Sequence, residues 1–278
     1  MGIKKVRANT PGRRNATFDD CADITKTTPE KRLIVIKKKT SGRNSQGKIT
    51  TRHRGGGEKR YIRLVDFKRD KFDIPATVAA IEYDPNRGAR LALLNYADGE
   101  KRYIIAPIGL VVGEKVLSSK NLIEIKVGNA MPVQHIPAGV AISNLEFEPG
   151  RGARIARGAG NAVFVMGVEG RFAQVKMPSG EIRLVKKECL CTVGQASNPD
   201  KRHIVLGKAG RSRHMGIRPT VRGTAMNPVD HPHGGGEGNQ SIGLRHPKTP
   251  WGKPALGVKT RRKRSSNKLI IKRRAKRK

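Results

Sequence analysis

The sequence predicts a mainly β protein in which two small β units carry long basic arms at both ends. Short apolar runs recur at intervals of about 8–12 residues between residues 60 and 195, which is typical of small barrels and sandwiches. One sequence pattern occurs twice in this region, and most of the net charge lies outside it. Only 36% of the 278 residues are hydrophobic, against roughly 45–50% in ordinary globular domains, so we expect the core to be confined to this middle region.

The net charge of +36 is concentrated in the arms. The first 72 residues hold 21 basic and 7 acidic residues, residues 194–278 hold 22 and 3, and residues 73–193 hold 15 and 12. Unbalanced charge repels itself, so arms of this kind are expected beside a polyanion, most often a phosphate backbone. Residues 259–278 have 12 basic residues and no acid, which predicts disorder until binding. A nuclear-localisation signal is the alternative for that segment.

Features of membrane insertion and secretion are absent from the sequence. It has no apolar run of about 18 residues, and no apolar segment follows the basic start at Met1–Arg7. Asp19, Asp20 and Asp23 argue against a transit peptide, because such peptides are poor in acids. The three cysteines lack the spacing of a disulfide framework and indicate reduced thiols. We therefore expect a cytosolic protein with no membrane partner.

Individual strands are predicted where β-branched and aromatic residues cluster. Ala97-Asp98-Gly99 separates two such runs and is a hairpin signal. Cys189 and Cys191 flank Leu190, which places both thiols on the core side of a strand. The other expected strands are Leu33–Ile36, Tyr61–Phe67, Ala76–Tyr83, Leu91–Tyr96 and Lys101–Ile105.

The repeated pattern indicates two similar β units. Both copies contain Ile-Pro-Ala, then Pro-x-Arg-Gly-Ala-Arg, then a turn that opens the next strand. Because several elements match in the same order, we interpret the middle region as two related units joined near residues 121–128. The matching pairs are residues 74–76 with 136–138, 85–90 with 149–154, and 98–100 with 179–181.

The arginines of the repeated loop are candidate RNA contacts. Arg87 and Arg90 flank a glycine in the first copy, and Arg151 and Arg154 do so in the second. A guanidinium group matches two phosphate oxygens at once. The alternative is that these arginines pair with the acid that precedes each loop, Asp84 or Glu148. Recurrence of the loop in both units favours RNA contact.

Gly55, Gly56 and Gly57 lie in a loop with five basic residues between positions 43 and 59. Consecutive glycines allow the backbone to approach a phosphate closely, and a flexible loop is the alternative. A nucleotide-binding P-loop is excluded, because the Gly-Lys-Ser/Thr ending is missing.

Residues 222–238 contain Asp230, His231, His233 and Glu237 and admit three interpretations. The two histidines and a carboxylate are metal-ligand types, and His231 beside Asp230 is a candidate acid–base pair. There is, however, no second ligand cluster, activated nucleophile or oxyanion hole in the pattern. We favour the third interpretation, a Pro/Gly-rich loop that threads between nucleic-acid helices. Aromatic residues make up only 4% of the chain, so it is expected to read folded RNA through arginine, lysine and backbone rather than to stack single strands.

Three segments carry a resemblance to a known family: residues 24–31, 43–57 and, most specifically, 221–238. With these, the chain resembles the ribosomal protein L2 family of the bacterial large subunit along essentially its whole length. The resemblance implies an OB-like barrel followed by an SH3-like barrel, with extended basic arms buried in ribosomal RNA. It places the N-terminal arm at residues 1–59, the OB-like domain at 60–123, the SH3-like domain at 124–200 and the C-terminal arm at 201–278.

The resemblance also implies a function. Members of this family bind 23S-type large-subunit RNA as primary binders, and support subunit association and tRNA placement near the peptidyl transferase centre. The implied partners are that RNA, neighbouring ribosomal proteins, the small subunit and nearby tRNA. We expect cytoplasmic ribosomes, with plastid ribosomes as the alternative. The implied cofactors are none beyond Mg²⁺ ions associated with the RNA. No enzyme activity is expected, and the alternatives are a non-specific nucleic-acid chaperone and a direct part for His231 in peptidyl transfer.

The residues expected to contact RNA come from both arms and both repeated loops. They are Arg52, His53, Arg54, Gly55, Gly56, Gly57, Arg87, Arg90, Arg151, Arg154, Arg157, Lys208, Arg211, Arg213, Arg218, Arg222, His231, His233, Arg261 and Arg262.

Overall fold

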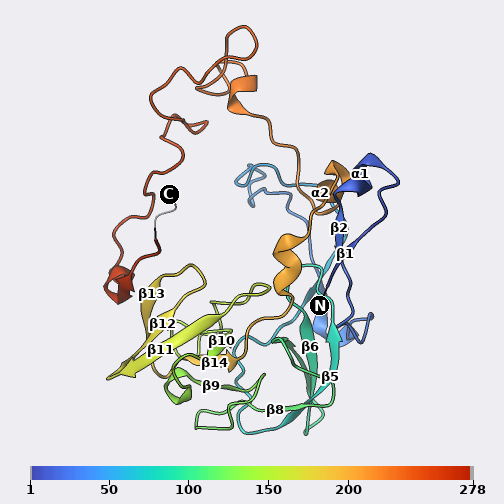
Figure 1. Cartoon of the computed structure of the whole chain (residues 1–278), viewed down its shortest axis with the longest axis vertical. Coiled ribbons are helices and arrows are strands. Elements are labelled where there is room, and N and C mark those ends of the chain that lie inside the picture. The colour runs from blue at the N-terminus through green and yellow to red at the C-terminus, as the bar shows by residue number, and fades with distance from the viewer. Residues whose placement is uncertain (1, 276–278) are drawn as a thin grey trace. The chain divides into compact units, whose positions relative to one another are not determined.

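The structure is a computed structural model that describes residues 2–275 of the chain (Figure 1). It divides into two compact units. The first contains the chain up to Lys38, Lys59–Ala209 and the segment from Ser266 onward, and the second contains Lys39–Glu58 and Gly210–Ser265. Part of each basic arm therefore belongs to the unit that carries the sheets, and part forms a unit of its own.

A four-stranded antiparallel sheet lies in the first unit, in the order β7-β6-β5-β8. Strand β6 is buried on both faces: Leu94 packs into one apolar cluster with Val78, and Leu93 packs into a second cluster with Tyr103. The strands expected at residues 76–83, 91–96 and 101–105 are confirmed. The bounds are β5 Ala76–Glu82, β6 Leu91–Tyr96, β7 Lys101–Ile105 and β8 Lys115–Val116.

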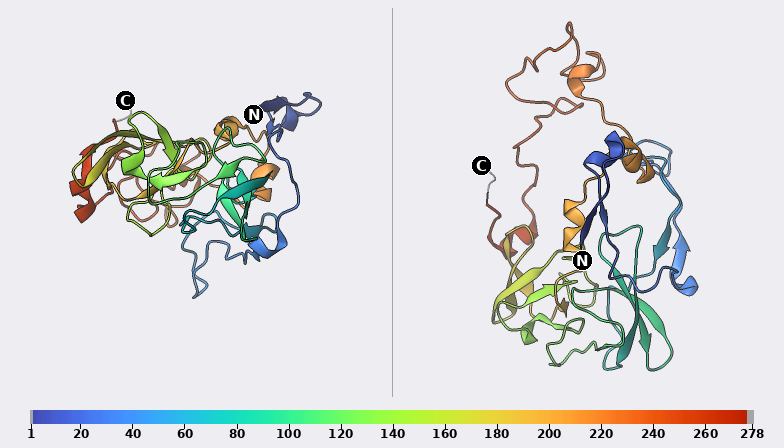
Figure 2. Two further views of the ribbon diagram at one scale, coloured as in Figure 1. Left: turned by 90° about the horizontal axis from the view of Figure 1, so that it is seen from below. Right: turned by 45° about the vertical axis from the view of Figure 1, so that its right-hand side comes forward.

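A seven-stranded antiparallel sheet lies beside it in the same unit, in the order β15-β13-β12-β11-β10-β14-β9 (Figure 2). Its core includes Cys189 and Cys191, which are both buried as the alternation predicts. Burial raises the pKa of Cys189 to about 12, so this thiol stays protonated at neutral pH. The bounds are β9 Ala130–Pro132, β10 Ala141–Ser143, β11 Val163–Glu169, β12 Phe172–Lys176, β13 Ile182–Lys186, β14 Leu190–Val193 and β15 Ile270–Lys272.

Strand β15 corrects the prediction that residues 259–278 lack structure before binding. Ile270 pairs with Arg183 of β13, and Lys272 pairs with Ile182, so two consecutive isoleucines extend the sheet despite the basic residues around them. The last three residues of the predicted disordered segment lie outside the described residues. Regular structure also continues beyond Gly194, where helix α2 spans Ala209–His214.

Two short strand pairs involve the N-terminal arm, one within it and one between the arm and the residues that follow it. β1 (Ile3–Lys5) pairs with β2 (Thr17–Asp19), and α1 (Pro11–Arg14) connects them. β3 (Ile34–Ile36) is the strand expected before the basic loop, and it pairs with β4 (Tyr61–Arg63). The strand expected at residues 61–67 is wrong beyond Arg63, because Val65 and Asp66 turn away to bond with Tyr103 of β7.

The repeat is confirmed at its turns but not strand by strand. Gly99 N–H donates to Tyr96 O, and Gly180 N–H donates to Met177 O at 2.9 Å in the same type of turn. The first turn joins β6 to β7, whereas the second joins β12 to β13, because the second copy of the repeat contains an additional hairpin at β11–β12. Similar turns thus connect strands in two sheets that differ in their number of strands.

Arg90 is buried, with only 1% of its side chain exposed, which corrects its prediction as an RNA contact. Its guanidinium donates to Asp19 Oδ1 at 2.8 Å and to Asp23 Oδ2 at 2.9 Å. Burial alone would raise the pKa of Asp19, but hydrogen bonds from the Cys21 N–H and from Arg90 hold it below its ordinary value. Asn198 also donates to Asp19, so one ion-pair network joins the N-terminal arm, the first repeated loop and the chain that follows β14.

Replacing Arg90 should remove the ion pairs that hold the N-terminal arm against the first repeated loop. Arg90→Met leaves two largely buried carboxylates without their cation and is expected to cost about 3–5 kcal/mol in denaturant unfolding. Arg154→Met, at the equivalent and exposed position of the second loop, should stay within about 0.5 kcal/mol. The contribution of Asp19 is present above its ordinary pKa of 3.8 and is lost as pH falls through the lower pKa of the folded state. Equal stabilities of the two variants would contradict this account.

Candidate nucleic-acid interface

The first candidate surface is centred on Phe67. The guanidinium carbon of Arg87 lies 5.5 Å from the centre of the Phe67 ring, and that of Arg157 lies 4.7 Å from it. Arg87 comes from the β5–β6 loop and Arg157 from the β10–β11 loop, so each sheet contributes one cation to the same aromatic ring. Stacking on the ring restricts both guanidiniums and leaves their N–H groups available for a ligand.

The glycines of the repeated loops allow this convergence. A Cβ atom at Gly88 would lie 3.0 Å from Ala159 Cβ and 3.1 Å from Lys201 Cγ. One at Gly152, where φ is +80°, would lie 3.3 Å from the carbonyl oxygen of Phe67. Ala153 N–H donates to that same oxygen at 2.7 Å. Close packing between segments of the protein therefore explains these two glycines without any ligand.

Buried acids hold both loops in shape. Asp84 is fully buried, accepts the Asn86 N–H at 2.8 Å and forms an ion pair with Arg87. In the second repeated loop, Glu146 takes this role, since it accepts N–H groups from Gly150 and Gly152 at 3.1 and 2.7 Å. The alternative in which the arginine pairs with the preceding acid thus holds for Arg87. An Asp84 partner orients Arg87 but uses only part of its five donors.

The second repeated loop has a more open arrangement. Arg151 pairs with Glu148 at 2.8 Å, and both side chains are exposed. Arg154 is also exposed, and its backbone pairs with Leu145. Neither side chain has a described contact with Phe67, so the structure brings together Arg87 and Arg157 but not Arg151 and Arg154.

Three further cations border the first surface and were missed by sequence reasoning. Lys37 Nζ donates to Asn86 Oδ1 at 3.2 Å, Arg60 donates to Pro85 O at 3.2 Å, and Lys201 packs against Gly88. These three residues are far apart in the chain, and none belongs to a recognisable sequence motif. They are found only because the folded structure brings them into contact with the first repeated loop. We call Phe67, Arg87, Arg157, Lys37, Arg60 and Lys201 the Phe67 surface.

The second candidate surface lies in the second unit, where the Gly-rich loop pairs with the chain that follows α2. Gly55 N–H donates to Gly216 O at 3.0 Å, Glu58 N–H donates to His214 O at 2.9 Å, and Arg218 N–H donates to His53 O at 3.0 Å. The two predicted basic segments are therefore partners. This pairing gathers the exposed side chains of Arg52, Arg54, Arg213 and Arg218, with the half-buried Arg211 in the same segment.

The glycines of this loop serve different purposes. A Cβ atom at Gly57 would lie 2.7 Å from Gly216 N and 2.9 Å from His214 O, so this glycine is required by packing within the chain. Gly56, with φ +64°, has no atom within 4 Å of an added Cβ and keeps an open side. Packing within the chain therefore accounts for the glycine at position 57, whereas Gly56 retains room for the predicted approach of a phosphate.

His231 and His233 lie in a tightly folded loop of the second unit. His231 is 8% exposed and its Nδ1 accepts the His233 N–H at 3.0 Å. His233 Nε2 accepts the Lys248 N–H at 2.7 Å. An added Cβ at Gly223 would lie 2.5 Å from the His231 ring, which shows how closely the loop closes over it. Both rings thus act as acceptors for backbone N–H groups, a structural use of the side chains.

A metal centre finds no support in the described structure. Within residues 2–275, no three His, Cys, Asp or Glu side chains gather as a group able to hold a metal ion. In the same range, no helix is long and apolar enough to cross a bilayer. The remaining predicted residues lie apart: Lys208 lies close to Gly12, while Arg222, Arg261 and Arg262 are exposed in the second unit.

Comparison with known families covers most of the chain. Residues 30–118 match the RNA-binding N-terminal domain of ribosomal proteins L2, and residues 126–252 match the C-terminal domain of ribosomal proteins L2. The chain belongs to the ribosomal protein L2 family. It is thus a structural, RNA-binding protein of the large ribosomal subunit, and its two sheets fit the expected OB-like and SH3-like folds in that order.

The two matched L2 domains meet at the Phe67 surface. Phe67 and Arg87 lie within the N-terminal match, and Arg157 lies within the C-terminal match. The Gly-rich loop also lies in the N-terminal match, whereas its partner segment near Gly216 lies in the C-terminal match. Both candidate surfaces therefore depend on pairing between the two L2 domains.

The Gly-rich pairing can be tested with adjacent glycines. Gly57→Ala should separate the loop from residues 214–216, because its Cβ would overlap backbone atoms. Gly56→Ala should cost only about 1–2 kcal/mol, since it meets a positive φ but no neighbour. Hydrogen exchange at the Gly55 and Glu58 amides should accelerate in the first variant and change little in the second. Equal exchange in both variants would show that the packing at Gly57 is unimportant.

Proposed function

We propose that the chain is a primary binder of 23S-type ribosomal RNA and that it docks through the Phe67 surface. The observation that carries this proposal is the stacking of Arg87 and Arg157, one from each domain, on a single ring. Such a pair is positioned before RNA arrives, so little side-chain freedom is lost on binding. A surface built by two domains reads the spacing of backbone phosphates, which is a property of folded RNA.

The second unit supplies a further basic surface, at Arg52, Arg54, Arg213 and Arg218. We infer that it extends the RNA contact and adds to the affinity by releasing counterions. Through this extension the protein supports subunit association and tRNA placement near the peptidyl transferase centre. Its partners are then neighbouring ribosomal proteins and the small subunit, in cytoplasmic ribosomes, with Mg²⁺ ions held by the RNA.

The Phe67 surface can be tested by single substitutions. Arg87→Ala and Arg157→Ala should each weaken binding of the full chain to large-subunit RNA by about 1–3 kcal/mol. Each should also reduce the slope of log affinity against log salt by about one phosphate contact. Arg171→Ala removes an exposed arginine in the β11–β12 turn and is the matched control, with no change expected beyond general charge. Filter binding across a salt series provides both quantities.

The same assay separates this proposal from a non-specific chaperone. Excess tRNA should leave binding of large-subunit RNA by the parent chain largely intact, because the Phe67 surface fits one RNA fold. If tRNA competes equally, or if all three variants lose affinity equally, the charge acts generically and the chaperone interpretation replaces docking.

We also propose that the role of His231 is structural and that this residue does not take part directly in peptidyl transfer. Its Nδ1 accepts a backbone N–H, and its ring is enclosed by Gly223, so it holds the loop closed rather than exchanging protons with a substrate. No activated nucleophile accompanies it among the described contacts.

Subunits assembled with His231→Ala test this point. We expect a less ordered 222–238 loop, seen as faster hydrogen exchange at the His233 amide, while the rate of peptide-bond formation stays within about tenfold of the parent, since loss of a general acid–base group costs about 10²–10⁴-fold. His233→Ala is the matched control, because it removes a comparable acceptor from the same loop. A loss of chemistry specific to His231→Ala, with assembly and tRNA binding intact, would overturn the structural assignment.

A further inference from the structure

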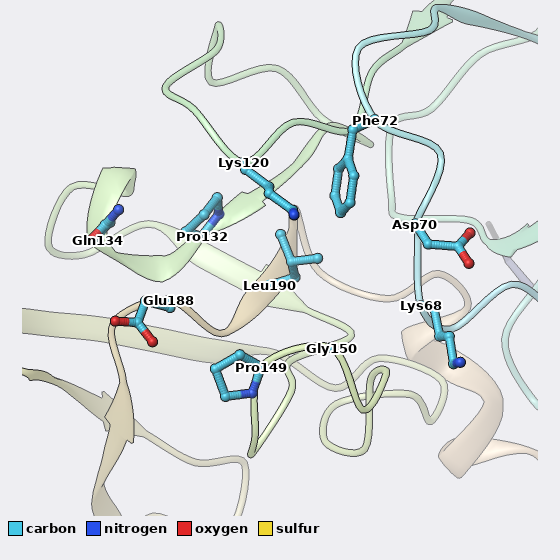
Figure 3. Close-up of a pocket in the computed structure, with 10 residues that line it drawn as sticks. All are labelled: Lys68, Asp70, Phe72, Lys120, Pro132, Gln134, Pro149, Gly150, Glu188 and Leu190. Carbon is cyan, nitrogen blue, oxygen red and sulfur yellow. The ribbon is translucent and has the colours of Figure 1, made fainter.

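A hollow of about 540 Å³ lies between the two sheets of the first unit (Figure 3). Phe72 and Lys120 come from the segments around the four-stranded sheet, whereas Pro132, Pro149 and Leu190 come from the seven-stranded sheet and its loops. Figure 3 shows Phe72, Lys120 and Leu190 among the side chains that line the hollow. A volume of this size accommodates a large side chain with part of its backbone, because ligand pockets span roughly 300–1,000 Å³.

The charge around the hollow differs from that of the rest of the chain. Its rim carries two cations, Lys68 and Lys120, and two acids, Asp70 and Glu188, on a protein with a net charge of +36. A hydrogen bond from Arg102 holds the pKa of Asp70 below its ordinary value, so that acid stays ionised. Glu188 is exposed. Because Arg102 already pairs with Asp70, the exposed Glu188 is the acid that repels phosphates here, and it disfavours RNA on its side of the hollow.

The walls favour an apolar side chain. Pro132 is buried, Leu190 is half-buried, and Pro149 is exposed at the edge. Lys120 Nζ lies 4.9 Å from the centre of the Phe72 ring and occupies a face on which a base would otherwise stack. An apolar centre inside a rim of mixed charge is the usual composition of a protein–protein contact.

We propose that this hollow binds a bulky apolar side chain from an extended segment of another protein in the large subunit, with a Lys or Arg of that segment facing Glu188. The proposal rests on membership of the ribosomal L2 family and is independent of the Phe67 surface. A peptide supplies an apolar group and neutral backbone, which suit the walls, and a basic flank matches the exposed acid.

Photo-crosslinking tests the proposal in the assembled particle. Large subunits are built with the full chain carrying p-benzoylphenylalanine in place of Phe72, irradiated, digested and analysed by mass spectrometry. The expected product joins position 72 to a peptide of another subunit protein that has a bulky apolar residue next to Lys or Arg. The same probe in place of Phe164, an exposed aromatic on β11, should not yield that peptide.

A substitution at the edge of the hollow then tests the site itself. With the probe at position 72, Pro149→Glu should lower the yield of this product more than about tenfold, as expected when a central contact is lost. Pro137→Glu, at an exposed proline of the same domain outside the hollow, should leave it unchanged. Thermal unfolding checks that both variants remain folded. An adduct with RNA, no adduct at position 72, or an unchanged yield with Pro149→Glu would overturn the proposal.

Discussion

The close approach of two loops from different sheets is the constraint on which the rest of the first unit depends. Gly88 meets Ala159 and Lys201, and Gly152 meets the backbone of Phe67, at distances that leave no room for a side chain to be added without movement. Protein interiors are packed densely, so such contacts restrict how the two loops can be placed relative to one another. The stacking of Arg87 and Arg157 on Phe67 is a consequence of this approach.

The acidic residues of the middle region form specific ion pairs and hydrogen bonds that stabilise the fold. Asp66 and Asp70 pair with Arg102, Glu82 accepts the Tyr103 hydroxyl at 2.6 Å, and Asp84 pairs with Arg87. Asp19 and Asp23, from the basic arm, compensate the buried guanidinium of Arg90. Each of these ion pairs also engages a base, and the excess of positive potential left for a polyanion comes from the 58 lysines and arginines that outnumber 22 acids.

Residues of the same type in one motif can have different structural roles. Arg87 and Arg90 are three residues apart in one motif, yet one stacks on an aromatic ring while the other is buried in an ion-pair network. His231 and Gly57 belong to segments typical of nucleic-acid contact, yet both are needed for packing within the second unit. A segment that is specific to a family can therefore contain residues that mainly stabilise the conformation of that segment.

The sequence by itself determined the β class, the positions of β3, β5, β6 and β7, the repeated turns and the basic character of both arms, because these follow from local propensity and composition. Its family segments also pointed to the L2 family that the domain matches establish. Only the tertiary structure decided which arginine faces outward and that β15 returns to β13. It also brought Lys37, Arg60 and Lys201 to the first repeated loop. These features depend on contacts between residues far apart in the chain, for which a local pattern holds no signal.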